Sequence, residues 1–249
     1  VDRRRALSFG AVAAAYAQHR PGYPVAAVRW ALRPVLGGAP PRLLDLGAGT
    51  GKLTTALAGF GSVVAVDPDD GMLDELRSRL PDVDARRGSA EEIPLPDSSV
   101  DAVLVGQAWH WFDHGRALTE IARVLRPGGA LAVLWNSDDS RVEWVAGYLA
   151  VIQSGRTAPA VRASDSLPAL PGHPAFAHSE FSTYPNALPT TADGLVHNVA
   201  THSWALVSEP DELRRVLDEL RAYLAGRPET SAGGFELPLV TEVLRALRK

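Results

Sequence analysis

The sequence contains no cysteine, and lysine is almost absent as well, occurring only at Lys52 and Lys249. Without cysteine, the chain cannot form a disulfide framework, a thiolate nucleophile or a zinc site with sulfur ligands. An absence of disulfides is also typical of a reducing compartment. We therefore predict a cytoplasmic protein.

The sequence also lacks long apolar runs and any excess of positive charge. No stretch is long and apolar enough to span a bilayer. The formal net charge is -4 at pH 7, whereas proteins that bind nucleic acid usually present a basic face. Residues 3–17 imitate a secretion signal, but this alanine-rich run is only weakly hydrophobic and favours an amphipathic helix. We predict a small-molecule partner, no nucleic acid and no membrane, and the oligomeric state stays open.

What the sequence does contain is the alternation of strands and helices that is typical of an α/β domain. Short apolar runs are separated by single helical patterns, so the strands must run parallel, with right-handed crossovers. The predicted strands are residues 42–46, 62–67, 83–87, 100–105 and 130–135. We expect a doubly wound, mostly parallel, Rossmann-like sheet.

The rest of the chain is expected to cover this sheet. Helical patterns precede it at 9–19 and 25–36. Later segments indicate helices at 142–152, 193–199 and 210–224, a loop at 155–174, a strand at 176–184, and a tail at 235–247 whose β character is interrupted by Pro238. We predict a single domain of 249 residues. Its parts are an N-terminal helical cover (1–40), a cofactor-binding core (41–136), and a lid of helices with the last strands (137–249).

A glycine-rich turn, GAGTG at residues 47–51, directly follows the first predicted strand. Glycine is required where φ is unusual or where a ligand touches the main chain, and ligands bind at this end of a parallel sheet. A phosphate-binding loop is excluded because Leu46 and Leu53 replace its first glycine and its hydroxyl residue. A dinucleotide fingerprint fails because Lys52 replaces its third glycine. The pattern that fits is acidic-x-G-x-G-x-G, beginning at Asp45. A turn that binds nothing is the alternative.

Asp67 ends the second predicted strand. An acidic side chain at this place can accept hydrogen bonds from both ribose hydroxyls of an adenosine moiety. Such a carboxylate is expected in nicotinamide and S-adenosylmethionine enzymes alike, so it indicates an adenosine ligand without separating the two. The alternative is that Asp67 caps the turn that follows the strand.

Four blocks of sequence together resemble the Rossmann-like, class I S-adenosylmethionine-dependent methyltransferases that act on small molecules. The blocks are LLDLGAGTGKLT (43–54), VVAVDPDDGML (63–73), GSAEEIPLPDSSVDAVLVGQAWHWF (88–112) and EIARVLRPGGALAVLWN (120–136). Their order and spacing are more specific than the glycine turn alone. Residues 9–24 also resemble the N-terminal helix of the trans-aconitate methyltransferase-like enzymes.

The resemblance implies S-adenosylmethionine as cofactor, with a set of residues around it. Those implied at the methionine end and ribose are Asp45, Gly47, Ala48, Gly49 and Gln107, with Tyr16 and Arg20 as a cover. Arg20 would bind the methionine carboxylate or lie at the surface. Those implied at the adenosine are Asp67, Pro68, Met72, Ser89, Ala90 and Glu91. Many relatives carry aspartate in place of Ser89, so Glu91 is an alternative partner for the adenine amino group.

The acceptor side of the site is expected just past the fourth strand, at Trp109, His110 and Trp111. Aromatic faces attract a sulfonium cation, although core packing is the alternative for each ring. His110 is a candidate base for a hydroxyl acceptor, or a structural hydrogen-bonding group. His110 and His114 have metal-ligand spacing, but Asp113 between them is predicted to be a helix N-cap, so we expect no metal site.

The predicted reaction is methyl transfer by in-line displacement to an oxygen of a small carboxylate or hydroxyl compound. Alignment of acceptor, methyl and sulfur, with exclusion of water, supplies most of the catalysis in such a displacement. Two alternatives stay open at this point: a nicotinamide-dependent oxidoreductase on a related sheet, and a regulator that binds the cofactor without catalysis.

Overall fold

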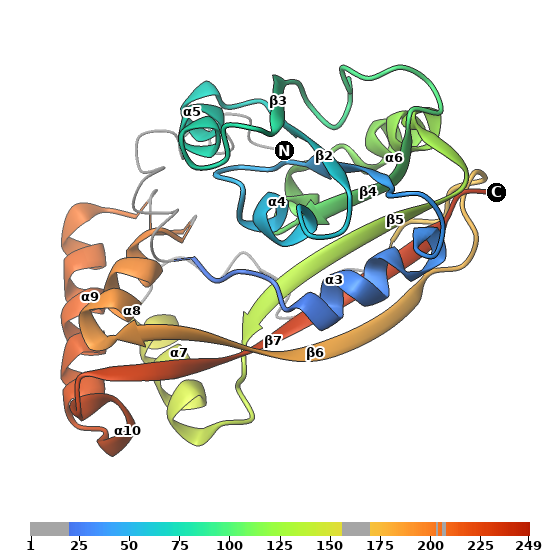
Figure 1. The fold of residues 1–249 in the computed structure, drawn as a ribbon. Coiled ribbons are helices and arrows are strands. Elements are labelled where there is room, and N and C mark those ends of the chain that lie inside the picture. The colour runs from blue at the N-terminus through green and yellow to red at the C-terminus, as the bar shows by residue number, and fades with distance from the viewer. Residues whose placement is uncertain (1–19, 156–169, 203, 206–207) are drawn as a thin grey trace.

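The computed structural model describes residues 20–155, 170–202, 204–205 and 208–249. Its centre is a seven-stranded sheet with the order β3-β2-β1-β4-β5-β7-β6 (Figure 1). The strands are β1 (Arg42–Leu46), β2 (Ser62–Asp67), β3 (Asp84–Arg87), β4 (Val100–Gly106), β5 (Leu125–Asp138), β6 (Glu180–Thr191) and β7 (Gly234–Leu247). The first five are parallel, and β7 runs antiparallel to both of its neighbours. The doubly wound, mostly parallel fold is confirmed.

Helices connect the strands and cover both faces of the sheet (Figure 1). They are α3 (Val25–Leu32), α4 (Lys52–Leu57), α5 (Asp70–Arg79), α6 (His114–Val124), α7 (Glu143–Ser154), α8 (Ala192–Ala200), α9 (Pro210–Ala225) and α10 (Pro228–Ser231). The helix predicted at 25–36 ends as α-helix at Leu32, because Pro34 follows and the chain tightens into a 3-10 turn, Arg33–Val35. The pattern at 9–19 lies outside the described residues.

The strand β4 shows how the sequence produces two layers of core. Alternate side chains of a strand point to opposite faces of the sheet. Val103 and Val105 pack on one face with Ile121 of α6, whereas Ala102 and Leu104 pack on the other face in the core that includes α3 and α4. Because both faces are buried, the strand is apolar throughout, as a central parallel strand requires.

The last two strands differ from the sequence prediction in their limits. The predicted strand at 176–184 is β6, which begins later and runs much further. The tail is one continuous strand, β7, so the predicted interruption at Pro238 is wrong. The Pro238 carbonyl faces the β5 side, where it accepts the Asp139 N–H. Its nitrogen therefore faces the same side, and β5 has already ended there, so no ladder hydrogen bond is lost.

The far ends of β6 and β7 extend beyond the main sheet and carry α7, α8 and α9 (Figure 1). These elements have a separate apolar core that includes Trp144, Tyr148, Leu195, Val199 and Leu220. We call this part the helical lobe. It occupies the place where the lid was predicted, and its role in covering a ligand stays a prediction. Within the described ranges, no helix is both long and apolar enough to cross a membrane.

The strand β6 lies at the edge of the sheet and contains Pro185 and Pro189. Proline cannot donate a ladder hydrogen bond, and β7 is the neighbour of β6 in the sheet. Both prolines therefore turn their nitrogens to the free edge. This edge lacks two of the N–H groups that another strand would need for pairing.

Candidate functional site

The glycine turn at 47–51 adopts the left-handed backbone that its sequence indicates. Gly47 has φ +74°, and a Cβ added there would lie 2.6 Å from the Ala108 Cβ, so the turn is pressed against the chain that follows β4. Gly49 has φ +53°, and a Cβ added there would meet nothing within 4 Å. Gly47 is thus required for packing, whereas Gly49 leaves open space above the turn.

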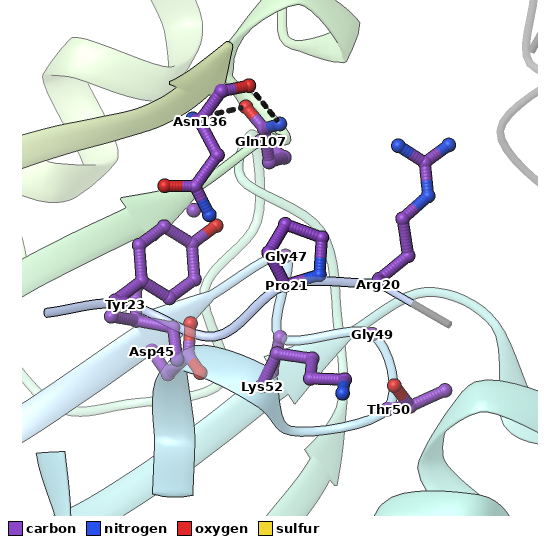
Figure 2. A pocket seen from close by; sticks show the side chains of 13 residues that line it. Arg20, Pro21, Tyr23, Asp45, Gly47, Gly49, Thr50, Lys52, Gln107 and Asn136 are labelled. Atoms are coloured by element: carbon purple, nitrogen blue, oxygen red, sulfur yellow. Dashed lines mark hydrogen bonds between the residues drawn. The ribbon is translucent and has the colours of Figure 1, made fainter. Parts of the chain in front are cut away.

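A cavity that opens to solvent lies over this turn (Figure 2). One side is the turn and the start of α4, and the other is the segment 20–24, which we call the N-terminal wall. Gly106, Gln107 and Asn136 at the ends of β4 and β5 close the cavity from behind. The residues that line it are Arg20, Pro21, Tyr23, Asp45, Gly47, Ala48, Gly49, Thr50, Lys52, Leu53, Gly106, Gln107 and Asn136.

Asp45 brings a buried carboxyl to the cavity. Its Oδ2 accepts a hydrogen bond from the Thr54 hydroxyl at 2.6 Å, and its Oδ1 has no partner among the described residues. Burial raises the pKa of Asp45 to about 7, with a further increase from Asp67, although the Thr54 bond acts in the opposite direction. The Thr50 hydroxyl is a second buried group without a described partner. Both groups line a cavity in which a ligand can satisfy them.

Asp67 holds two backbone turns together. Its Oδ2 accepts the Gly49 N–H at 2.8 Å, and its Oδ1 accepts the Asp69 N–H at 2.9 Å. Burial raises the pKa of Asp67 to about 6, while these two backbone N–H groups lower it. The side chain therefore caps the turn after β2, which was the alternative interpretation, and it also fixes the glycine turn. Contact with a ribose stays a prediction.

Gln107 has a strained backbone for a residue other than glycine, with φ 55°. Its side-chain amide donates to the Asn136 carbonyl at 2.9 Å, and its Oε1 accepts the Asn136 N–H at 3.3 Å (Figure 2). The strained turn after β4 is thus tied to β5 beside the cavity, and the placement of Gln107 near the methionine end stays a prediction.

Only one of the two residues that were predicted to cover the cofactor lies in the described part of the chain. Tyr16 lies outside the described residues. Arg20 lines the cavity, and its guanidinium donates from Nε to the Thr201 hydroxyl and from Nη2 to the Thr201 carbonyl, both at 3.1 Å. Thr201 is the C-cap of α8. Arg20 therefore links the N-terminal wall to the helical lobe.

The residues predicted at the adenosine do not line this cavity. Pro68 and Met72 follow β2, and residues 89–91 follow β3, at the same edge of the sheet. Met72 and Ala90 are buried, whereas Ser89 is partly exposed. The Glu91 carboxylate accepts the Asp113 N–H at 2.9 Å, so it holds the start of α6. Asp113 is the N-cap of that helix, as predicted.

The aromatic residues past β4 separate into two environments. Trp109 is completely buried, and its ring stacks on His114 at 4.8 Å, so in this conformation it packs in the core. His110 is exposed, with its ring 4.4 Å from Trp111 and 5.2 Å from Trp135. This crowding removes water from the imidazole and lowers the pKa of His110 to about 4. No group of three metal-ligating side chains occurs in the part of the chain that the structure describes.

Several residues that line the cavity were not predicted from the sequence. Tyr23 and Asn136 belong to segments that carry the family resemblance, but no role was predicted for them, and tertiary packing brings them to the cavity. Thr50 and Lys52 stand within or just after the glycine turn, so their closeness to Gly49 was the available signal. The glycine turn was therefore enough to predict where the site lies. The N-terminal wall on the opposite side of the cavity could not be predicted from any single segment of the sequence.

The fold and this site define a protein of the open α/β class, in which ligands bind at the carboxyl ends of the strands. Residues 44–133 match the family model of a methyltransferase domain. The chain is 46% identical over 247 residues to an uncharacterized methyltransferase of Mycobacterium tuberculosis, which covers 98% of this chain and 97% of that protein. The chain belongs to the methyltransferases, so the oxidoreductase and regulator alternatives are wrong. S-adenosylmethionine is the methyl donor of this family.

Two further comparisons support this assignment. A malonyl-[acyl-carrier protein] O-methyltransferase of Methylococcus capsulatus is 46% identical over 104 residues, covering 39% of this chain and 38% of that protein. A solved structure of a candidate type II methyltransferase from Anaeromyxobacter dehalogenans has a TM-score of 0.67 and 28% identity. It covers 92% of this chain, and the match spans 97% of that structure.

Proposed function

We propose that this methyltransferase binds S-adenosylmethionine over the glycine turn and transfers the methyl group to an oxygen of a small carboxylate or hydroxyl compound. We place the cofactor here because one oxygen of the buried Asp45 carboxyl has no described partner, and Asp45 lines a cavity that is bounded by the glycine turn. A buried carboxyl without a full set of partners favours a ligand that brings a donor or a positive charge.

The charges of the turn favour this cofactor over a dinucleotide. Asp45 lies at the start of the turn and lines the cavity, and its ionised carboxylate would repel a pyrophosphate. S-adenosylmethionine instead carries an ammonium and a sulfonium, and its methionine carboxylate can meet the ammonium of Lys52, which lines the same cavity. Arg20, in the N-terminal wall, also brings a positive charge to the cavity, although its guanidinium is bonded to Thr201.

The remaining cofactor residues keep the roles that the family resemblance implies. Gly47, Ala48 and Gly49 would lie against the methionine part and ribose, with Asp67 accepting from the ribose hydroxyls. Tyr16 would cover the cofactor. The proposed adenine side consists of Pro68, Met72, Ser89, Ala90 and Glu91.

When bound, the cofactor supplies a methyl group that is activated by its positive sulfur. The chain's own residues then have to exclude water and hold the acceptor in line with that methyl group. We place the acceptor near His110, Trp111 and Trp135, whose rings meet beside the end of β5. With a pKa of about 4, His110 is neutral at physiological pH, so it can accept a proton from a hydroxyl or simply contact the acceptor.

A carboxylate is the acceptor class that we favour. The similar Methylococcus protein is named as an O-methyltransferase, and the N-terminal segment of this chain resembles trans-aconitate methyltransferase-like enzymes. A carboxylate is already ionised at neutral pH and needs no base. The weakly basic His110 suits such an acceptor, since it would act as a contact. A cytoplasmic location and a single domain remain part of this proposal.

Calorimetry tests the cofactor placement. We expect the purified protein to bind S-adenosylhomocysteine, and not NAD or ATP. Binding of NAD without binding of S-adenosylhomocysteine would overturn the proposal. Mass spectrometry of small molecules retained on the purified protein gives an independent identification. Turnover with a panel of carboxylic acids and phenols then tests the acceptor class, which would be wrong if only nitrogen or carbon acceptors were methylated.

A further inference from the structure

The N-terminal wall is held from behind by two side-chain amides that converge on one carbonyl. The Gly22 carbonyl accepts a hydrogen bond from Asn136 Nδ2 at 3.0 Å and another from Asn186 Nδ2 at 3.0 Å. Asn136 ends the buried part of β5, whereas Asn186 is on the edge strand β6. Gly22 lies between Pro21 and Tyr23, both of which line the cavity.

Asn136 is the centre of a wider network. Its Oδ1 accepts the Thr241 hydroxyl at 2.5 Å and the Asn186 amide at 3.2 Å. Its backbone N–H and carbonyl pair with the side chain of Gln107. The buried residue Asn136 therefore joins the end of β4 and the strands β5, β6 and β7 to the N-terminal wall. Networks of this kind fix geometry because every buried group depends on the others for its partner.

The wall also fits closely against the core at Tyr23. A Cβ added at Gly106 would lie 2.5 Å from the Tyr23 hydroxyl oxygen, so the phenol occupies the space that a side chain would need. Together with the bonds from Arg20 to Thr201, the wall is fixed at its start, its middle and its end. Residues of β5, β6 and the helical lobe thus hold the wall in position.

We propose that Asn136 and Asn186 are positioning residues for cofactor binding, which hold Pro21 and Tyr23 against the cavity through the Gly22 carbonyl. This inference rests on the proposed function, because the cavity is the cofactor site. Neither amide needs to touch the cofactor. The loss of one amide lets the wall move outward, which weakens cofactor binding and speeds product release without changing the reacting groups.

Asn186 gives the sharper test because it lies on the edge strand and is only partly buried. Asn186→Ala removes one bond to Gly22, and we expect the Kd of S-adenosylhomocysteine to rise about fivefold, as for one neutral hydrogen bond. Asn186→Asp keeps the size but turns an oxygen towards the Gly22 carbonyl, so its Kd should rise at least as much. In both variants kcat at saturating S-adenosylmethionine should stay within about twofold of the wild-type value.

Ser182→Ala is the matched control, because Ser182 lies on the same face of β6 and bonds no part of the wall in the described structure. Hydrogen exchange of the amides in residues 20–24, measured without any ligand, should accelerate in the Asn186 variants and not in the control. A general loss of stability would instead lower kcat through the active fraction and leave Kd unchanged.

The possible results of these measurements distinguish a failure of this inference from a failure of the proposed function. Unchanged Kd and unchanged exchange at 20–24 in both Asn186 variants would overturn the positioning role. An Asn186→Asp variant that behaves like the wild type while Asn186→Ala does not would assign the effect to packing volume, which also overturns it. If the wild type binds no S-adenosylhomocysteine, the proposed function fails, and the exchange measurement still decides whether Asn186 holds the wall.

Discussion

Asp45 is the residue of the cavity on which the proposed cofactor binding depends most. It lies at the end of β1, where the sequence pattern places an acidic residue before the glycine turn, and it is completely buried. One of its oxygens is bonded to Thr54 and the other faces no described donor. The raised pKa follows from this combination, because burial disfavours the charge and one hydrogen bond compensates only part of the cost.

The raised pKa of Asp45 predicts that cofactor affinity depends on pH. The ammonium group that S-adenosylmethionine and S-adenosylhomocysteine share favours the ionised carboxylate, so affinity should be full above about pH 7 and fall as pH drops through 7. Between pH 8 and pH 6 the loss should be about tenfold. Calorimetric titration of S-adenosylhomocysteine at several pH values measures this. In Asp45→Asn the affinity should be lower and flat across this range, and an unchanged slope would refute the assignment.

The raised pKa of Asp45 also makes the stability of the ligand-free protein depend on pH, in the direction opposite to that of cofactor affinity. The folded state keeps a proton on Asp45 between about pH 4 and pH 7, whereas the unfolded state loses it. The free energy of unfolding should therefore decrease as pH rises through this window, and Asp45→Asn should reduce that decrease. Urea denaturation at pH 5 and pH 7.5 provides the comparison, and it is independent of cofactor binding.

A second prediction concerns Asp67. Asp67→Ala removes the acceptor of the Gly49 and Asp69 N–H groups and the proposed partner of the ribose. We expect a loss of cofactor affinity on the order of 2 kcal/mol, together with a lower melting temperature. Asp70→Ala is the control, since Asp70 is exposed beside Asp67 and pairs only at the surface with Arg87. Wild-type affinity in a folded Asp67→Ala protein would leave Asp67 with the turn-capping role alone.

A third prediction concerns His110 and the acceptor. Because its pKa is lowered to about 4, His110 does not titrate near neutrality, and turnover of a carboxylate should be flat between pH 6 and pH 8 apart from the Asp45 effect on cofactor binding. His110→Ala should raise the KM of the acceptor and leave kcat within a few-fold. A fall in kcat of about 10²-fold would instead identify a general base and a hydroxyl acceptor. Exposed His178, mutated to alanine, provides the control.

At the scale of elements, the sequence predicted the parallel half of the sheet well because apolar runs and turns are local signals. The predicted ends of β1 and β2 agree with the structure. The sequence placed the start of β5 too late. In the structure β5 already pairs with β4 at Leu125, and after an irregularity at Val100 the pairing resumes beyond the turn at Gly128. β6 was misplaced because its exposed and partly buried residues alternate without a strong apolar face.

In the site, too, residues that are close in the sequence were predicted, whereas residues that meet only in the folded chain were not. Asp45 and the glycine turn were predicted because a strand, a turn and a helix follow one another directly. Gly22, Asn136 and Asn186 were given no role because they meet through pairing of strands far apart in the sequence. The Pro238 prediction failed for a related reason, since only the register with β5 reveals that its nitrogen faces no partner.

At the scale of the whole molecule, the free edge of β6 bears on self-association. Replacing Pro185 and Pro189 by valine restores two N–H groups at that edge and favours strand pairing with a second chain. We expect Pro185→Val combined with Pro189→Val to show more concentration-dependent association than the wild type in light scattering. Thr183→Val is the control, because it raises β propensity on the same strand without adding an N–H group. Identical scattering of all three proteins would show that the prolines do not protect the edge.

The placement of β7 between β5 and β6 has a consequence for how the molecule is made. β7 follows the other six strands along the chain, so a ribosome releases β6 before its partner strand exists. The five parallel strands can assemble during synthesis, whereas the edge strand must wait for β7 to insert beside β5. Asn186 reaches Gly22 only after that insertion. One of the two amide bonds that hold the wall is therefore made only after the last strand has been synthesised and has joined the sheet.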